Sequence, residues 1–377
     1  MEAPFVFGKF ATDKNFTDRE METDHLSINF TSLINTILIS PRRWGKSSLV
    51  NRAAEIALKN DKMLRFCFID LYNTRTEEQF YRSLSEEILR VSSGKMEVLL
   101  ENAKKYLGRF IPRISFSPDS ISDFSLSLDW DEVKKRPEDI LNLADNIAKE
   151  KNLKFVVCID EFQNISNFED PVAMQKKLRS HWQKHQHASY CLYGSKRHML
   201  MDVFTSPSMP FYKFGDIVFL EKIKREDWIP FIQSRFAETG KKINTDEASM
   251  IVDLAECHPY YVQQLAQLCW LRTAGVCKKK VVEAAHESLV LQLSMLFQTI
   301  TDGLSNKQVN FLKALLSGAE LLSSQKTLEV YGLGTSANVS KIKEALVYKE
   351  IIDIQGKVIE ILDPVYKFWL SKYYFRL

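Results

Sequence analysis

The sequence lacks several features that define other classes of protein. It has no apolar run approaching the ~18 residues that a membrane-spanning helix needs. Met1–Pro4 contains an acidic residue and no basic one, so we expect no signal peptide. The six cysteines form no CxxC pair, and Cys67, Cys158 and Cys191 each lie within an apolar run. Cysteines of this kind favour a reducing, cytoplasmic location over a disulfide framework.

Internal repeats, low-complexity tracts and Pro/Gly-rich linkers are also missing from the 377 residues. At ~150 residues per domain, this length predicts two or three domains. Basic and acidic residues nearly balance, 51 against 48, for a net charge of +3. That balance argues against a protein that wraps nucleic acid over its whole surface, although it allows a local basic patch. The composition, 45% hydrophobic and 26% charged, is typical of a globular fold.

Hydrophobic periodicity predicts strands that alternate with helices. Helices are predicted at Lys46–Asn60 and Glu77–Val91, the second clearly amphipathic. The predicted strands are continuous apolar runs at residues 34–39, 64–71, 155–159, 190–193 and 217–220. Because such runs are buried on both faces, they indicate a parallel sheet between two helical layers, an α/β fold.

Two further regions depart from this pattern. Residues 110–116 and 124–128 alternate apolar and polar side chains around a Pro-Asp-Ser turn, which predicts a hairpin-like insert at about 108–130. The chain is mostly helical from about residue 223, and after about 304 helices are followed by a small hairpin typical of a winged helix. We therefore predict a core at 1–222, a helical lid at 223–300 and a winged-helix domain at 301–377.

The strongest motif is Ser40-Pro41-Arg42-Arg43-Trp44-Gly45-Lys46-Ser47, between a predicted strand and a predicted helix. Backbone N–H groups and a helix N-terminus in such a loop, with Ser48 in the first turn, suit a triphosphate. Gly45 permits a close approach, Lys46 reaches the β- and γ-phosphates, and Ser47 ligates Mg²⁺. Since Ser40 stands where this loop usually has glycine, a chance strand–turn–helix with an exposed lysine is the alternative.

A second motif supports the first. The apolar strand at residues 155–159 ends in Asp160-Glu161. Ligands of parallel sheets lie beyond the C-terminal strand ends, where the Ser40–Ser47 loop is also expected. We therefore predict that Asp160 holds Mg²⁺ through water and that Glu161 polarises the attacking water. Ser195, after the strand at 190–193, is a candidate sensor of the γ-phosphate, with an ordinary turn as the alternative.

These motifs and their order resemble the archaeal-type ATPase family, within the STAND branch of AAA-like P-loop NTPases. The matching segments, from about residue 5 to the end, include residues 16–20, 40–49, 70–72, 157–163, 192–195, 210–212 and 258–261. The resemblance implies a five-stranded Rossmann-like core, a helical lid and a C-terminal winged helix. It also implies that Arg19 with Glu20, and Pro259, lie near the adenine.

The sequence departs from that family in three places. Ser40 replaces the first loop glycine, and Cys257 stands where the family usually has glycine before His258-Pro259. After Pro210-Phe211-Tyr212, Lys213-Phe214 follow where the family often places an arginine. Because such an arginine can accelerate phosphoryl transfer ~10³-fold or more, we expect slow hydrolysis unless another cation or a partner acts in its place.

Three functions are consistent with these observations. The leading prediction is an ATP·Mg²⁺-driven switch that relays its state through the lid and the winged helix. The others are an ATP-regulated DNA-binding protein and a protein that holds ATP as a structural ligand. Residues 301–377 contain ten Lys/Arg and eight Asp/Glu, a difference of +2, so no basic stripe supports DNA binding. An aromatic tail at residues 366–375 suggests packing against the core or a protein partner.

Two smaller features leave alternatives open. His181, His185 and His187 could suggest a metal site, but no acid or cysteine stands nearby at ligand spacing, so a polar helix is favoured. Trp44 could pack over the nucleotide or against a partner.

Overall fold

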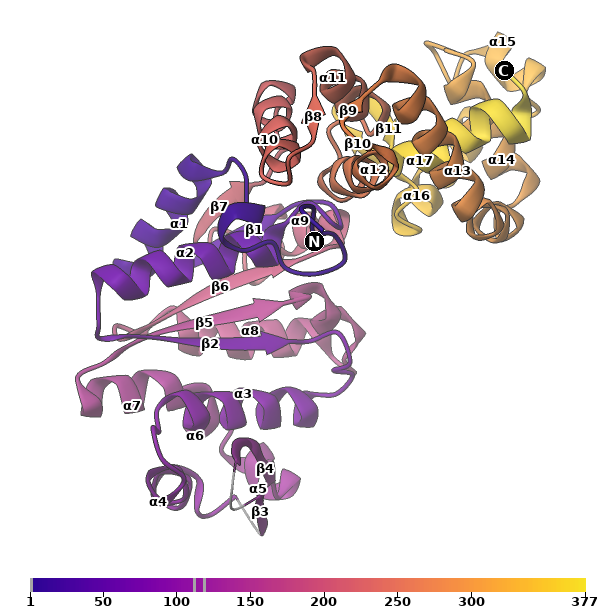
Figure 1. Cartoon of the computed structure of the whole chain (residues 1–377). Coiled ribbons are helices and arrows are strands. Elements are labelled where there is room, and N and C mark those ends of the chain that lie inside the picture. The colour runs from indigo at the N-terminus through magenta and orange to yellow at the C-terminus, as the bar shows by residue number, and fades with distance from the viewer. Residues whose placement is uncertain (1–2, 111–112, 118–119) are drawn as a thin grey trace. The chain divides into compact units, whose positions relative to one another are not determined.

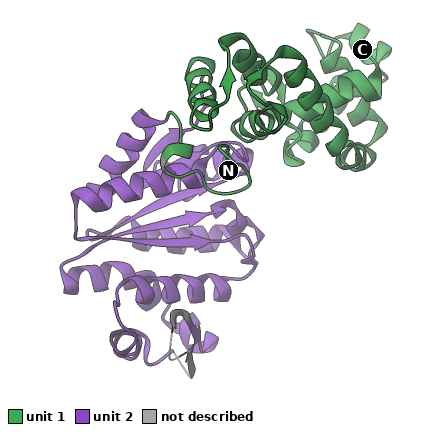
Figure 2. Ribbon diagram, in the orientation of Figure 1, with its two compact units in different colours: residues 1–18, 222–377 green, residues 19–221 purple. Residues whose placement is uncertain are grey.

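The computed structural model describes residues 3–110, 113–117 and 120–377. The chain divides into two compact units, shown in different colours in Figure 2. One unit is Arg19–Glu221; the other combines Met1–Asp18 with Lys222–Leu377. Among the described residues, none of the helices is both long enough and apolar enough to cross a bilayer.

The Arg19–Glu221 unit is built on a five-stranded, fully parallel sheet with strand order β2-β5-β6-β1-β7 (Figure 1). The strands are β1 (Thr36–Ile39), β2 (Leu64–Asp70), β5 (Lys154–Asp160), β6 (Ala188–Gly194) and β7 (Asp216–Phe219). All five predicted strands are confirmed, and so is the α/β fold. Each parallel connection needs a crossover, and the helices between the strands supply it.

The helices of this unit follow the sequence pattern closely where that pattern was strong. The predicted helices Lys46–Asn60 and Glu77–Val91 are α2 and α3, with the same bounds. α3 begins at Glu77 because the Thr76 side chain accepts a hydrogen bond from the Gln79 N–H. The others are α1 (Glu20–Thr31), α4 (Met96–Leu107), α5 (Trp130–Lys135), α6 (Glu138–Leu141), α7 (Leu143–Lys151), α8 (Pro171–Trp182) and α9 (Arg197–Thr205).

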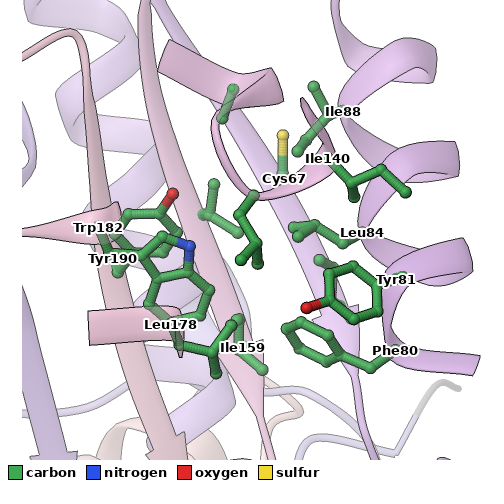
Figure 3. Close-up of a cluster of buried hydrophobic side chains, with 14 of the residues drawn as sticks. Cys67, Phe80, Tyr81, Leu84, Ile88, Ile140, Ile159, Leu178, Trp182 and Tyr190 are labelled. Atoms are coloured by element: carbon green, nitrogen blue, oxygen red, sulfur yellow. The ribbon is translucent and has the colours of Figure 1, made fainter. Parts of the chain in front are cut away.

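Alternate residues of each strand pack against opposite helical layers. One face, with Cys67, Ile159 and Tyr190, joins α3, α6 and α8 in a single apolar cluster (Figure 3). Side chains of α9 belong to the same cluster. In this cluster Trp182 stacks on Tyr190, with 3.9 Å between ring centroids. The other face meets α1 and α2, where Phe30 contacts Phe66 edge-on at 5.3 Å. The sheet is thus the middle layer of three.

In the region of the predicted hairpin-like insert, β3 (Arg113–Ser117) pairs antiparallel with β4 (Ser120–Ser127). Pro118 and Asp119, in the predicted turn, lie outside the described residues. β4 is tied to α3, since Glu86 accepts a hydrogen bond from the Leu126 N–H at 2.7 Å.

The second unit is mostly helical, as predicted from residue 223 onward. Its first part contains α10 (Arg225–Ala237), α11 (Thr245–Leu254), α12 (Pro259–Arg272), α13 (Lys279–Asp302) and a short parallel pair, β8 (Lys242–Ile243) with β9 (Val276–Cys277). The first 18 residues belong to this unit as well. The predicted boundaries had assigned them to the core at 1–222. Phe5 is buried in this unit's apolar cluster, and the Arg235 guanidinium donates to the Pro4 carbonyl and to Asn15.

The last part of this unit has the element order predicted for a winged helix. It consists of α14 (Asn306–Leu316), α15 (Gln325–Val330), α16 (Ser336–Tyr348), an antiparallel hairpin of β10 (Ile352–Gln355) with β11 (Val358–Ile361), and α17 (Pro364–Trp369). Part of the aromatic tail packs inside its own unit. Tyr366 contacts Phe297 of α13 and shares a hydrogen bond with Thr301, while Phe368 meets His286.

Candidate functional site

The loop between β1 and α2 turns sharply at two positions. Arg43 and Gly45 both adopt left-handed backbone conformations, with φ of 64° and 90°. Ser40, the first residue of the loop, is buried and has no such conformation. A serine is therefore tolerated where the motif usually has glycine, because the backbone there does not require one.

The loop leads directly into the N-terminus of α2. The helix begins at Lys46, its N-cap Gly45 offers no side-chain cap, and its first turn contains no acidic residue. The first N–H groups of a helix lack intrahelical partners and carry the positive end of the macrodipole. A helix N-terminus at the end of a glycine-containing loop suits an anion such as phosphate.

The side chains of the loop divide into buried and exposed sets. Lys46 is only 6% exposed, and its ammonium donates to the carbonyl oxygens of Pro41 at 3.0 Å and Ser40 at 3.4 Å. Trp44 is 7% exposed, so it lies inside the molecule. Ser48 is buried too, whereas Arg42 and Arg43 are exposed. A buried lysine beside a helix N-terminus keeps a positive charge within reach of a bound anion.

Ser47 and Asp160 meet although 113 residues separate them in sequence. The Ser47 hydroxyl donates to Oδ2 of Asp160 at 2.8 Å. Burial raises the pKa of Asp160, while the bonds from Ser47 and the Glu161 N–H and the charge of Lys46 act the other way. A hydroxyl and a partly desolvated carboxylate form an oxygen pair that suits Mg²⁺. These residues therefore fit the predicted metal position.

Glu161 and Ser195 also meet, at the ends of neighbouring strands. β5 pairs directly with β6, so the residues that follow each strand lie side by side. Ser195 donates to Oε2 of Glu161 from its hydroxyl at 3.0 Å and from its backbone N–H at 3.3 Å. Glu161 itself has a left-handed backbone, φ 52°. This strained turn is of the kind that concentrates at functional sites.

Gln163 contacts Glu161 and was not singled out by sequence reasoning. Its amide Nε2 donates to the same Glu161 Oε2, and the side chain is 1% exposed. Gln163 is the last residue of the 157–163 segment named in the family resemblance. A polar residue a few positions after a strand does not by itself indicate which side chains it will contact. Five predicted residues, Lys46, Ser47, Asp160, Glu161 and Ser195, thus gather at one edge of the sheet, with Gln163 beside them.

Arg19 lies in the same unit and marks its boundary. It is 4% exposed, has φ 77°, and donates to Glu22 at 2.9 Å and to the Glu221 carbonyl oxygen. The bond to Glu221 joins the first and last residues of the unit. No described contact links Arg19 to the Ser40–Ser47 loop.

Pro259 belongs to the other unit. It is buried at the first position of α12, where its fixed φ suits helix initiation. Cys257, two residues earlier, has φ 58°. A glycine would adopt that conformation more easily, so the cysteine costs about 1 kcal/mol of backbone strain.

The segment after Pro210 is held by a cation that the sequence analysis did not identify. Phe214 is buried and packs against Phe211, with 4.9 Å between ring centroids. Arg179 of α8 donates to the carbonyl oxygens of Pro210 and Tyr212, each at 2.6 Å. Arg179 thus orders the segment in which the resembled family places its arginine.

His181 and His185 lie close together in the structure. No group of three or more His, Cys, Asp or Glu in the described part of the chain could hold an ion. His181 and His185 both contact the Asn142 side-chain oxygen, and burial lowers the pKa of His185 to about 4.

The chain is similar in structure to Walker-type ATPases. It matches "paby2304" of Pyrococcus abyssi with a TM-score of 0.67 and 18% identity, covering 97% of this chain and 99% of that one. It matches the ORC2 protein of Aeropyrum pernix, solved as ADPNP–ADP complexes, with a TM-score of 0.53 and 14% identity over 96% and 94% of the two chains. No protein-family model and no curated protein matches the chain. At these identities the similarity shows the fold, that of a P-loop NTPase.

Proposed function

We propose that this protein binds ATP·Mg²⁺ and hydrolyses the γ-phosphate. The observation that carries the proposal is the convergence of Ser47 and Asp160, 2.8 Å apart, beside the N-terminus of α2. Two residues so distant in sequence meet where a phosphate-bound Mg²⁺ needs oxygen ligands. The P-loop NTPase fold supports it, as does the nucleotide in one structurally similar protein.

Each residue has a role in this proposal. The backbone of Ser40–Ser48 and the Lys46 ammonium bind the phosphates, and Ser47 and Asp160 hold Mg²⁺. When bound, Mg²⁺ neutralises charge that develops on the transferred phosphoryl group. Glu161 orients the attacking water, and Ser195 senses the γ-phosphate.

We propose further that the nucleotide state is relayed through the helical and winged-helix parts to a protein partner. The near-neutral C-terminal region supports a protein in preference to DNA, since phosphate neutralisation supplies much of DNA affinity.

Phosphate release by the purified full chain tests the function, with and without duplex DNA. We expect slow release that DNA leaves unchanged. Glu161→Gln should keep ATP binding and lose about 10²- to 10⁴-fold in turnover, the usual contribution of a positioned base. Stimulation by DNA supports the DNA-binding alternative, and ATP binding without any release supports a structural ligand.

A further inference from the structure

The Glu161 carboxylate is held through one oxygen. Its Oε2 accepts hydrogen bonds from the Ser195 hydroxyl, the Ser195 N–H and the Gln163 amide. None of the hydrogen bonds described for this carboxylate falls on Oε1. The side chain therefore has one anchored oxygen and one oxygen available to a ligand.

The Gln163 amide can face Glu161 in only one orientation. An ionised carboxylate only accepts hydrogen bonds, so the NH₂ group must point toward it and the amide oxygen away. That amide oxygen, Oε1 of Gln163, is buried without a hydrogen-bond partner among the described residues. A buried unsatisfied acceptor destabilises the fold, so stability alone does not explain a glutamine here.

Gly194 provides the space that Gln163 occupies. A Cβ built on Gly194 would lie 1.9 Å from Oε1 of Gln163 and 3.2 Å from Cα of Glu161. Gly194 is a strand residue of β6 without a left-handed backbone, so its backbone conformation does not require glycine. Glycine is required because the Gln163 side chain approaches the Gly194 backbone too closely for a Cβ atom.

We propose that Gln163 is a positioning residue for Glu161, an inference that rests on the proposed ATPase function. Gln163 and Ser195 hold Oε2 from two sides, so that Oε1 faces the attacking water. In hydrolysis, the water oxygen bonds to the γ-phosphorus as the bond to the β–γ bridging oxygen breaks. ADP departs with that electron pair, and the proton of the water is accepted at Oε1 before it passes to phosphate.

Gln163→Leu removes the donor while keeping a side chain of similar size. We expect kcat to fall about 10-fold or more, in the range found when a partner that orients a functional ligand is lost, with the ATP Kd within about 2-fold of wild type. Gln175→Leu is the matched control, because Gln175 of α8 is also 1% exposed and its amide oxygen likewise has no hydrogen-bond partner in the described part of the chain. It should keep wild-type kcat.

A second variant perturbs the same contact from the other strand. Gly194→Ala should displace the Gln163 amide and lower kcat similarly, and it decides the matter if Gln163→Leu does not fold. Single-turnover rates in the Glu161→Gln background complete the test. If Gln163 acts through Glu161, adding Gln163→Leu there changes the residual rate less than about 2-fold, because effects of residues that act as a unit do not add.

The outcomes separate this inference from the function on which it rests. A wild-type protein that does not hydrolyse ATP overturns the proposed function itself. An active wild type in which Gln163→Leu and Gly194→Ala keep full kcat overturns only the positioning role. The positioning role is also overturned if Gln163→Leu lowers the single-turnover rate in the Glu161→Gln background as much as it lowers the rate of the wild type.

Discussion

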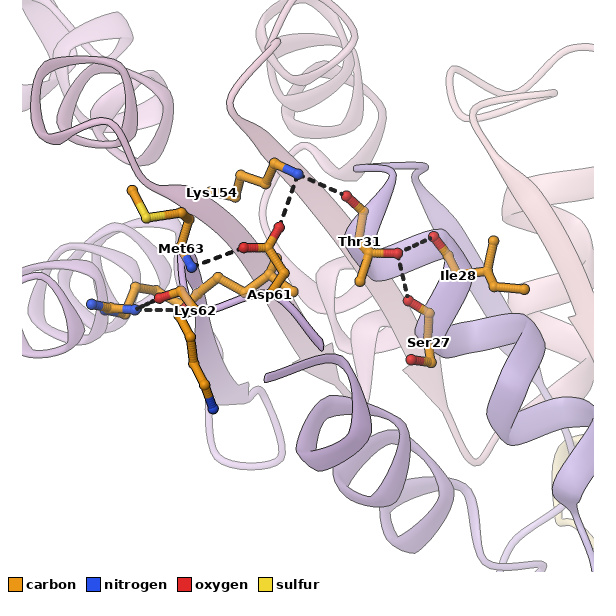
Figure 4. A network of polar contacts seen from close by, with 9 residues as sticks. Ser27, Ile28, Thr31, Asp61, Lys62, Met63 and Lys154 are labelled. Carbon is orange, nitrogen blue, oxygen red and sulfur yellow. Dashed lines mark hydrogen bonds and ion pairs between the residues drawn. The ribbon is translucent and has the colours of Figure 1, made fainter. Parts of the chain in front are cut away.

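The two ends of β5 place charged residues in opposite environments. The strand begins at Lys154, whose ammonium donates to Asp61 at 3.0 Å and to the Thr31 carbonyl oxygen at 3.1 Å (Figure 4). It ends at Asp160, which meets the Ser47 hydroxyl and forms no described ion pair. At the first end, opposite charges are matched and half-exposed. At the second, a carboxylate is partly buried without an ion-pair partner.

The pKa shifts at the two ends have opposite signs. The hydrogen bond from Lys154 lowers the pKa of Asp61, helped by the Met63 N–H. Burial raises the pKa of Asp160. A lowered pKa means that the fold favours the charged carboxylate, and a raised one that the fold disfavours it. At the Lys154 end of β5, the charged carboxylate of Asp61 stabilises the fold. At the Asp160 end, the charged carboxylate destabilises the fold until a bound cation compensates it.

The largest expected contrast is between the lysines at the two ends. Lys46→Ala removes the ammonium next to the phosphate site, and we expect ATP binding to weaken by about 2–3 kcal/mol, roughly 100-fold. Lys154→Ala should leave ATP affinity unchanged, because its contacts lie at the opposite end of the sheet. Calorimetric titration of both variants measures the difference. Wild-type affinity in Lys46→Ala contradicts the phosphate-binding assignment.

The next contrast concerns the metal. Asp160→Ala removes one oxygen of the Ser47–Asp160 pair, so we expect the Mg²⁺-dependent part of ATP affinity to fall about 10-fold, or 1.4 kcal/mol. Titration of ATP with and without Mg²⁺ measures that part separately. Asp61→Ala, at the other end of the sheet, is the control and should retain the Mg²⁺-dependent part of ATP affinity. An equal loss of affinity in Glu161→Gln would falsify the division of roles between the two acids.

A smaller effect concerns stability and pH. Since the folded state raises the pKa of Asp160, the ionised carboxylate destabilises the fold above that pKa. As pH falls through the raised pKa toward the unfolded value of about 3.9, this destabilisation is relieved. Asp160→Asn should therefore stabilise the nucleotide-free protein by about 1 kcal/mol at pH 7, with the gain shrinking at lower pH. Urea unfolding of the wild type and Asp160→Asn between pH 7 and about pH 4 measures the difference in the free energy of unfolding. A variant that is less stable than the wild type at pH 7 contradicts the prediction.

The contrast between the two ends also explains what the sequence could predict. The five strands and the bounds of α2 and α3 follow from local hydrophobic periodicity, and so they were predicted. Asp160 and Glu161 lie directly after one predicted strand, and Lys46 and Ser47 begin the predicted helix that follows the loop after another. Parallel strands end at one edge, so the sequence also predicted that these residues converge.

Residues that depend on non-local packing were missed or misassigned. The contact between Gln163 and Gly194 requires the register of β5 against β6, which periodicity does not define. Arg179 reaches the Pro210 carbonyl across 31 residues of sequence. Composition identified an aromatic tail but not the surface that it covers, which is α13. The same holds for the chain start, whose few apolar residues pack on a segment more than 200 positions away.

The smallest expected effect tests the matched end of β5. Lys154–Asp61 and Lys177–Glu77 are ion pairs of nearly equal exposure, 40% and 22% against 41% and 20%, at 3.0 and 2.9 Å. Half-exposed pairs contribute about 0.5 kcal/mol. Lys154 has the additional bond to the Thr31 carbonyl oxygen, so Lys154→Ala should cost about 1 kcal/mol and Lys177→Ala about half of that.

A double-mutant cycle with Asp61→Asn isolates the Lys154–Asp61 ion pair in urea unfolding. We expect a coupling of about 0.5 kcal/mol at low salt that shrinks in 1 M NaCl, where the Debye length is about 3 Å. The Thr31 contribution should persist in high salt, because it is a hydrogen bond to a neutral carbonyl. A coupling of several kcal/mol that salt leaves unchanged contradicts a half-exposed pair, and with it the contrast between the two ends of β5.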